Sequence, residues 1–297
     1  MYRIAMLITV LSFLACKATE NRPVAVPDGF DWQGHRGCRG LKPENSLPAF
    51  MHALAFPEVT TLELDLAVSK DGKLIVSHEP FFNPAICLQA DGSRFTDSTS
   101  MKLPLLKLTA DEIRQFDCGS MGNPRFPEQD KIRVFKPTFR EVVAAVRAVR
   151  PSVRWNIEIK SQPSWDNIFH PAIEEFAALL ISELKEYGIT DFVTVQSFDI
   201  RALEAMHRLA PEIRLAYLIE NMDSIERNLK KLSFVPDIYS PYYLTVGHRA
   251  VQTCRKHNMK LIPWTVNEVT AMRRLVRLGV DGIITDYPDR IRSVYQP

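Results

Sequence analysis

A turn-rich stretch near the start of the folded chain, GHRGCRGLKPENSLPAF, gathers residues that could do acid–base and phosphate chemistry. It places a histidine, an arginine and a carboxylate close together: His35, Arg36 and Glu44. Its glycines and prolines break helical and strand periodicity, which indicates a loop at the end of a strand. Ionisable groups on loops that a rigid scaffold holds are typical of binding and catalytic sites. This loop is therefore a candidate catalytic segment.

A second group of charged residues lies on an apolar strand, TLELDLAV. The strict alternation puts Glu63 and Asp65 on one face and the leucines on the other. Two carboxylates on one face, about 6–7 Å apart along the strand, repel each other unless a cation or a shared proton compensates. This strand therefore predicts a cation near Glu63 and Asp65.

The same pattern recurs in RWNIEIK, where Asn156, Glu158 and Lys160 share one face. A protruding, solvated strand could explain one such pattern, but two strands together with the charged loop favour a functional site. Inward carboxylates are the oxygen ligands that hard cations prefer. The sequence thus predicts a site for Mg²⁺ or Ca²⁺.

The elements that must position these groups alternate between β-like and helical patterns. The candidate strands are QGHRG, TTLELDLAV, KLIVSH, RWNIEIK, FVTVQSF, RLAYLIE, DIYSP, KLIPWTV and GIITD, and helical patterns include SLPAFMHALAF, capped by Asn45, TFREVVAAVRAVR, AIEEFAALLISELKEYG, RALEAMHRLA and EVTAMRRLVRLG. Alternation of this kind predicts a parallel sheet covered by helices, and the number of units suits an α/β (β/α)₈ TIM barrel over residues 30–297. Nine candidate strands are one more than the barrel needs. TTLELDLAV and KLIVSH must pair as a hairpin, because the connection SKDGK between them is too short for a parallel crossover.

The hairpin turn decides where His78 points. A two-residue turn at Asp71 and Gly72 would place Asp65 opposite His78, on the face that carries the carboxylates. A three-residue turn with Gly72 in the left-handed region would instead place His78 opposite Leu64, on the other face. We expect the first pairing, because it brings His78 to the acidic cluster.

A long segment after His78, residues 79–136, fits no strand–helix unit. It is rich in Pro, Gly, Asp and Ser and exceeds the usual connection of about 2–6 residues, so we expect an insertion that lies over one barrel mouth as a lid or substrate-shaping element. Cys87 and Cys118 lie within it, and they either form a disulfide or remain buried thiols. No cysteine spacing fits a zinc site.

The N-terminus reads as a targeting segment rather than as part of the fold. A basic start precedes the apolar run 4–15, which is shorter than the about 20 residues of a membrane span. FLAC resembles a bacterial lipoprotein box, with Cys16 as the lipidated residue and residues 1–25 as signal peptide and tether. A conventional signal cleaved a few residues later is the alternative. Either way, we expect an exported protein, periplasmic or anchored to a bacterial membrane.

The composition sets further bounds. The chain has 297 residues, of which 46% are hydrophobic and 24% charged, and this suits one large α/β domain or two small ones. Its 37 basic and 35 acidic residues form no long run of either sign, so no nucleic-acid partner is expected.

An ordered series of motifs in this chain resembles that of glycerophosphodiester phosphodiesterases. The motifs are HRG at 35–37, PEN at 43–45, ELDL at 63–66, SHEP at 77–80, EIK at 158–160, QSF at 196–198, WTVN at 264–267 and GVDGIITDYP at 279–288. The match spans nearly all of residues 33–290, and segment 79–136 resembles the family's inserted subdomain. Ser46 and Glu79 are conservative departures from the usual threonine and aspartate.

The resemblance implies metal-dependent hydrolysis of a small glycerophosphodiester to glycerol 3-phosphate and an alcohol. It implies one divalent cation, Mg²⁺ or Ca²⁺, at Glu63, Asp65 and Glu158. His35 and His78 would be the acid–base pair, without an indication of which is the acid. The other implied contacts are Arg36 and Lys160 to the phosphate, Glu44 to the cation or to Arg36, and Gln196, Phe198 and Trp264 to the glycerol end.

Two alternatives remain open at this point. A phospholipase C- or D-like enzyme of the same barrel type would act on intact lipid, but segment 79–136 lacks a basic, aromatic amphipathic helix suited to a membrane interface. An inactive, lipid-anchored binding module would not need His78 in addition to His35 and the carboxylates. The first feature favours a soluble substrate, and the second favours an enzyme over a binding module.

Overall fold

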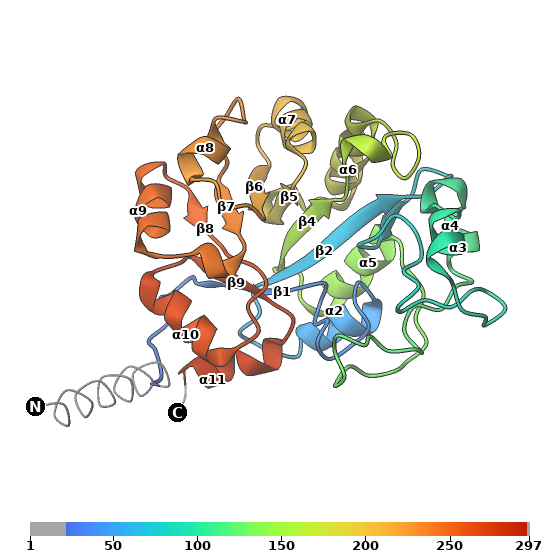
Figure 1. The fold of residues 1–297 in the computed structure, drawn as a ribbon, viewed down its shortest axis with the longest axis horizontal. Coiled ribbons are helices and arrows are strands. Elements are labelled where there is room, and N and C mark those ends of the chain that lie inside the picture. Colours follow the sequence, from blue (N-terminus) through green and yellow to red (C-terminus); the bar gives the residue numbers. More distant parts are fainter. Residues whose placement is uncertain (1–21, 296–297) are drawn as a thin grey trace, which may run out of the picture.

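The computed structural model describes residues 22–295, in which parallel strands and helices alternate around a barrel (Figure 1). The strands are β1 Asp31–Gly34, β2 Thr61–Val68, β3 Leu74–Val76, β4 Arg154–Ile159, β5 Val193–Ser197, β6 Arg214–Ile219, β7 Ile238–Pro241, β8 Lys260–Leu261 and β9 Gly282–Thr285. The α-helices are α2 Leu47–Ala53, α3 Asp97–Met101, α4 Ala110–Ile113, α5 Phe139–Val149, α6 Ile173–Tyr187, α7 Ile200–Leu209, α8 Ile225–Leu229, α9 His248–Lys256, α10 Val269–Leu278 and α11 Arg292–Tyr295.

The strands form one sheet in the order β8-β7-β6-β5-β4-β2-β1-β9, with β3 paired antiparallel to β2. The remaining neighbours are parallel. Backbone bonds from Asp281 N to Leu261 O and from Val266 N to Ile284 O, both 2.9 Å, bring the two ends of the sheet together. The (β/α)₈ barrel predicted from the alternating pattern is therefore confirmed.

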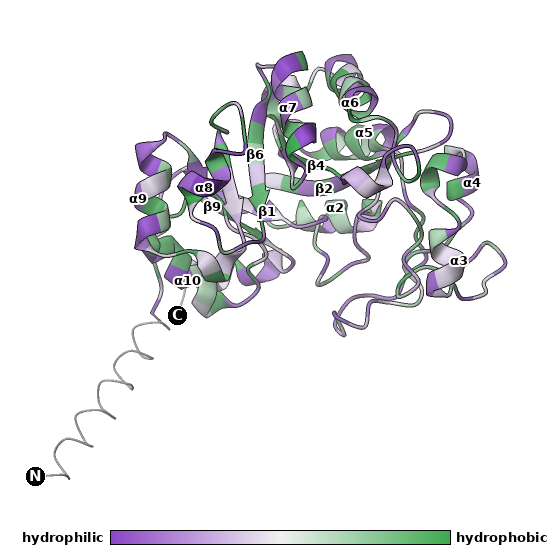
Figure 2. Ribbon diagram, turned by 45° about the horizontal axis from the view of Figure 1, so that its top comes forward, coloured by the Kyte–Doolittle hydropathy of each residue, from purple (hydrophilic) through white to green (hydrophobic). Residues whose placement is uncertain are grey.

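Alternation along β2 sends its leucines outward into the main core, where Leu62, Leu64 and Leu66 are fully buried under the helices. The helices cover the barrel with their apolar faces, and hydrophobic and hydrophilic residues alternate around α6, α7 and α9 (Figure 2). Capping residues mark the limits of two of these helices. Thr138 and Glu141 form a capping box at the start of α5, and Gly188 ends α6 with a φ of 61°.

The barrel interior has two chemically different halves. The apolar half consists of Ala216, Ile238, Ile262 and Ile284, with Trp264 packed against them. The polar half, on β1, β2, β4 and β5, consists of buried amides and carboxylates: Gln33, Glu63, Asp65, Asn156, Glu158 and Gln196. A barrel core is usually filled by branched apolar residues, so the polar half marks the strands that carry the chemistry.

Two local predictions were wrong. Ser46, not Asn45, caps α2, because the Ser46 side chain accepts a hydrogen bond from Ala49 N. Asn45 instead adopts a φ of 53° and donates its amide to Asp65 Oδ2 at 2.8 Å. An asparagine tolerates the left-handed region, so it can turn its side chain away from the helix end and towards the site.

The predicted pairing of the β2–β3 hairpin was also wrong. Leu66 pairs with Val76, and Gly72 has a φ of 68° in a three-residue turn. The ladder stops at Val76, however, and Ser77 N still donates to Asp65 O at 2.9 Å. His78 therefore lies beyond the end of β3, so the alternation of side chains along a strand does not determine the direction of its side chain.

Residues 79–136 carry α3 and α4 and lie beside the end of β2 (Figure 1). Their apolar residues, including Phe82, Phe95 and Leu105, share one buried cluster with Ala67 of β2 and Ile75 of β3. Cys87 and Cys118 form a disulfide within this cluster, which settles the alternative left open by the sequence. That the segment is a separate subdomain stays a prediction.

The predicted targeting segment, with the apolar run 4–15 and Cys16, lies outside the described residues. Chain contact with the barrel is already present at Val24, whose N–H donates to Val294 O at 3.1 Å. Within residues 22–295, none of the helices combines the length and the hydrophobicity that a membrane crossing requires.

Candidate active site

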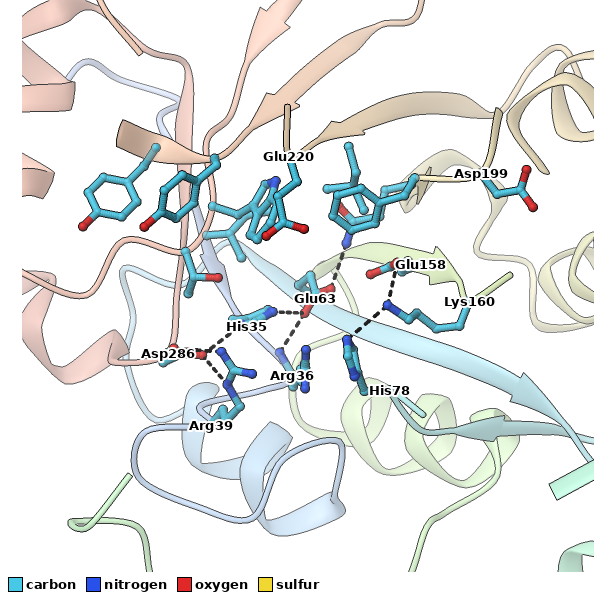
Figure 3. Close-up of a pocket in the computed structure, with 18 of the residues that line it drawn as sticks. His35, Arg36, Arg39, Glu63, His78, Glu158, Lys160, Asp199, Glu220 and Asp286 are labelled. Carbon is cyan, nitrogen blue, oxygen red and sulfur yellow. Dashed lines mark hydrogen bonds and ion pairs between the residues drawn. The ribbon is translucent and has the colours of Figure 1, made fainter. Parts of the chain in front are cut away.

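A cavity of about 1180 Å³ opens at the carboxyl ends of the barrel strands and collects the predicted site residues (Figure 3). His35, Arg36, Glu63, His78, Glu158, Lys160, Gln196, Phe198 and Trp264 all line it. This end of a (β/α)₈ barrel is where loops from different strands converge, so residues far apart in sequence meet there. Arg125 and Phe126 of segment 79–136 also contribute to the lining.

Three carboxylates form an acidic cluster at this cavity, of which Glu63 and Glu158 line the cavity and Asp65 does not. Glu63, Asp65 and Glu158 are buried and each offers an oxygen within 4.8 Å of the others. The parallel pairing of β2 with β4 sets Asp65 directly beside Glu158. Asp65 Oδ1 is buried and has no hydrogen-bond partner, so a cation ligand position is available. The donor set and this orphaned oxygen fit a hard divalent cation.

The electrostatics of the cluster follow from burial and like charge. Burial and the neighbouring Asp65 raise the pKa of Glu63 well above its ordinary value. Burial also raises the pKa of Glu158 to about 7, although Lys160 opposes this effect. Burial opposes ionisation of Asp65 as well, but the Arg36 guanidinium holds the pKa of this carboxyl below its usual range. The protein thus concentrates negative charge that an added cation would stabilise.

His35 is oriented by a carboxylate that the sequence analysis left without a role. Its Nδ1 lies 2.6 Å from Asp286 Oδ1, and its Nε2 lies 3.9 Å from Glu63 Oε2 (Figure 3). Arg39 donates to both oxygens of Asp286, and Asn267 donates to Oδ2 at 2.8 Å. Burial and Arg39 lower the pKa of His35 to about 4 against the opposing effect of Asp286.

His78 faces the same cavity from the opposite side (Figure 3). Its Nδ1 lies 2.9 Å from Glu79 Oε1, and its Nε2 lies 3.1 Å from Lys160 Nζ. Burial and the Arg36 guanidinium lower the pKa of His78. In both predicted histidines, Nδ1 therefore contacts a carboxylate and Nε2 points towards the acidic cluster.

Arg36 and Lys160 are the cations closest to the acidic cluster. Arg36 donates to Glu44 Oε1 at 2.6 Å, and its Nε lies 3.2 Å from Asp65 Oδ2. Glu44 thus pairs with Arg36 and is absent from the acidic cluster. Lys160 Nζ donates to Glu158 Oε1 at 2.9 Å. Although burial opposes its charge, Glu158 raises the pKa of Lys160, which keeps the ammonium protonated.

The Arg36 backbone has a φ of 49°, which is unusual for a residue with a side chain. This conformation directs Arg36 N–H to Glu63 Oε2 at 2.8 Å. Local strain of this kind is characteristic of functional sites.

Aromatic residues form the outer wall of the cavity. Phe198 is 39% exposed, and its ring meets the Trp264 ring nearly at a right angle with centroids 5.4 Å apart. Trp264 is fixed by a hydrogen bond from Nε1 to Ser240 O at 2.9 Å. Gln196 differs from these two, because its Nε2 donates to Glu63 Oε1 at 2.8 Å and so contacts the acidic cluster.

Several residues of the site received no role there from the sequence, namely Arg39, Glu79, Asn267 and Asp286, and Asn45 was assigned only to a helix cap. Asp286 had a usable signal, since it follows the apolar strand GIIT at the carboxyl end where barrel sites lie. Glu79 and Arg39 had none, because they lie in irregular loops whose path the pattern does not define.

Comparison with known proteins agrees with this geometry. Residues 35–290 match the model of the glycerophosphoryl diester phosphodiesterase family. Glycerophosphodiester phosphodiesterases from Bacillus altitudinis and Caldanaerobacter subterraneus subsp. tengcongensis are 32% and 30% identical, and each match covers 86% of this chain and 94% of the relative.

Solved structures show the same architecture. A protein from Silicibacter pomeroyi DSS-3, provisionally named a glycerophosphoryl diester phosphodiesterase, superimposes with a TM-score of 0.80 at 27% identity, covering 93% of this chain and 96% of that one. An Oleispira antarctica phosphodiesterase gives 0.71 at 22% identity, covering 92% and 98%. The chain therefore belongs to the glycerophosphoryl diester phosphodiesterase family and is an enzyme that hydrolyses glycerophosphodiesters.

Proposed function

We propose that the cavity cleaves a glycerophosphodiester to glycerol 3-phosphate and an alcohol with one divalent cation held by Glu63, Asp65 and Glu158. The observation that carries the proposal is the buried acidic cluster with the orphaned Asp65 Oδ1, beside two histidines held in the same cavity. The Oleispira antarctica structure is a complex with the product sn-glycerol-3-phosphate, which agrees in chemistry with this product.

Charge complementarity explains how these residues favour the reaction. The transition state of a diester gathers negative charge on the non-bridging oxygens of phosphorus. Arg36 and Lys160 are buried cations at the cavity floor, so they stabilise that charge more than the charge of the bound substrate. A divalent cation held by Glu63, Asp65 and Glu158 would supply further positive charge to stabilise this transition state. Water is the nucleophile in hydrolysis.

Two proton transfers complete the reaction. One histidine takes a proton from the attacking water, and the other gives a proton to the oxygen of the departing alcohol. Asp286 and Glu79 accept at the Nδ1 atoms of His35 and His78, so each ring exchanges its proton through Nε2. The pair returns to its starting state when the proton is passed back through solvent.

The decisive experiment measures release of glycerol 3-phosphate from a panel of glycerophosphodiesters, with and without chelator. We expect turnover that chelator abolishes and that Mg²⁺ or Ca²⁺ restores, and the restoring ion identifies the cofactor. If turnover were undiminished in chelator, and metal analysis showed that the protein held no cation, the cation assignment would be wrong. Intact phospholipid as a better substrate would favour the phospholipase alternative.

We also propose that the protein is exported and that Cys16, within the lipobox-like FLAC, anchors it to a membrane. Cys16→Ser should move the protein to the soluble fraction with turnover unchanged. A mature N-terminus beyond Cys16 in the wild type would rule out the anchor and leave a conventional signal peptide.

A further inference from the structure

A chain of hydrogen-bonded side chains crosses the polar half of the barrel, from the acidic cluster to the opposite end. Gln196 Nε2 donates to Glu63 Oε1 at 2.8 Å, and Asn156 Nδ2 donates to Gln196 Oε1 at 2.9 Å. The same Asn156 Nδ2 donates to Gln33 Oε1 at 2.7 Å, and Gln33 Nε2 donates to Asp31 Oδ2 at 2.9 Å. The three amide residues are each 2% exposed, so water does not replace these bonds.

Both ends of this chain are carboxylates, which accept hydrogen bonds when ionised. With a cation bound, the ionised Glu63 would accept through Oε1 from the NH₂ group of Gln196, and Asp31 Oδ2 accepts from the NH₂ group of Gln33. The amide oxygens of Gln33 and Gln196 then face Asn156. The NH₂ group of Asn156 donates a hydrogen bond to each of them. If the Asn156 amide were flipped, its oxygen would face the amide oxygens of Gln33 and Gln196, and both hydrogen bonds would be lost. The orientation of all three amides is therefore fixed.

Asp31, at the end of the hydrogen-bonded chain that lies away from the acidic cluster, is held by further hydrogen bonds. Asp31 Oδ1 accepts from Thr60 Oγ1 at 2.8 Å, from Thr61 Oγ1 at 2.6 Å and from Arg154 Nη2 at 2.9 Å. These three donors hold the carboxylate in place, so the far end of the barrel provides a fixed reference for the amides.

The buried oxygen of Asn156 lowers the stability of the fold. Its Oδ1 is buried and has no hydrogen-bond partner, which destabilises a fold unless another role compensates. An apolar residue would suit the barrel interior better, as the isoleucines of the apolar half show. The double donation by its NH₂ group is the compensating role that the geometry offers.

We infer that Asn156 and Gln33 are positioning residues for the cation site: they lock the Gln196 amide with its NH₂ group towards Glu63 and so hold that carboxylate for the cation. The inference rests on the cation of the proposed function. It assigns Gln196 to the support of Glu63, in place of the glycerol contact expected from the sequence. Groups that orient a metal ligand in this way commonly change metal affinity when they are removed.

The test is calorimetric titration of Mg²⁺ and of Ca²⁺ into the cation-free full-length protein, without substrate. We expect Gln196→Leu to weaken cation binding about 10–100-fold. Asn156→Leu should act in the same direction by a smaller factor, although no hydrogen bond joins its side chain to any of the three carboxylates. In the double variant, the Asn156 change should add nothing, because its route through Gln196 is already removed. Thr194→Val is the matched control on β5, since Thr194 pairs beside Asn156 but takes no part in the chain.

Thermal unfolding of the cation-free variants separates positioning from damage to the fold, because a general loss of stability would persist in the double variant. Equal cation affinity of wild type and Asn156→Leu, or additive effects in the double variant, would overturn the inference and leave the cation site standing. A wild type that binds neither cation would overturn the cation site of the proposed function and the inference with it.

Discussion

His35 Nδ1 and Asp286 Oδ1 lie 2.6 Å apart, although 251 positions separate them in sequence. Parallel pairing of β1 with β9 causes this approach, since it sets Gly34 beside Thr285 at the carboxyl end of both strands. Burial opposes ionisation of Asp286, but His35 and Arg39 hold the pKa of this carboxyl well below its usual range. Asp286 is therefore a permanent acceptor that fixes the His35 tautomer.

Asp286→Asn should lower kcat by about 10²–10⁴-fold, the contribution typical of general acid–base catalysis, with little change in KM. The variant keeps the shape of the side chain but removes the charge that supports a protonated His35. Steady-state kinetics on glycerophosphodiesters measure this effect. Asp289→Asn is the control, because Asp289 lies three positions later and is exposed. A kcat within a factor of about two of wild type would show that His35 needs no such support.

Removal of the cation should make stability depend on pH through Glu158. Its pKa is about 7 in the folded protein, against an ordinary value of 4.5 when unfolded. Between these pH values, the unfolded chain releases a proton that the folded chain keeps, so this carboxyl destabilises the fold as pH rises. In chelator, the free energy of unfolding of wild type relative to Glu158→Gln should therefore fall from about pH 4.5 to pH 7.

The variant provides the control for this titration, because glutamine keeps the shape and carries no proton to lose. Denaturant unfolding at several pH values measures the difference, and titrating groups that do not interact with Glu158 cancel in it. Glu158→Gln should also bind Mg²⁺ or Ca²⁺ less tightly than wild type. A difference that is constant with pH, or unaltered cation affinity, contradicts the placement of Glu158 in the acidic cluster.

Glu44→Gln should raise KM about 10-fold and leave cation affinity unchanged. Glu44 accepts from Arg36 Nη1 at 2.6 Å, and a buried hydrogen bond between charged groups contributes about 1.5–3 kcal/mol. Glutamine can still accept this bond but carries no charge, so the weaker contact should let the guanidinium move from the phosphate-binding position proposed for it. Kinetics together with cation titration distinguish the two roles that the sequence left open. Weaker cation binding with an unchanged KM would make Glu44 a ligand after all.

Replacement of Cys87 and Cys118 by alanine should reduce the free energy of unfolding by about 2–4 kcal/mol, as expected for a bond that closes a loop of this size. Turnover should stay close to that of wild type, because the disulfide lies in the buried cluster of segment 79–136 and not in the cavity lining. Denaturant unfolding and kinetics check both parts. Cys254→Ala, at a buried free thiol, controls for loss of packing alone. A large fall in kcat would show that the disulfide holds the residues of this segment that line the cavity in place.

Strand and helix identity was largely predictable, because period-two and period-3.6 patterns are local. The inward carboxylates Glu63, Asp65 and Glu158 were predictable for the same reason, since alternation alone fixes the face of a strand. Parallel pairing of β2 with β4 then made Asp65 and Glu158 neighbours, as the barrel topology requires.

Loop geometry was not predictable in the same way. The turn at Gly72 follows the conformation of a few backbone bonds, and the sequence did not distinguish a two-residue from a three-residue turn. The partners of His35 and His78 come from distant or irregular segments, so no local pattern joins them. His78 reached the site despite the wrong pairing, because β3 ends before it and leaves its direction to the following loop.

The two ends of segment 79–136 are fastened beside each other. Val76 N donates to Pro137 O at 2.8 Å, and Lys136 Nζ donates to Ser77 Oγ at 2.7 Å. The entropy of closing a loop whose ends already meet grows only slowly with its length. The segment is thus an exchangeable cassette: evolution or an engineer can lengthen, shorten or replace its outer part while His78 beside it keeps its position on the barrel rim.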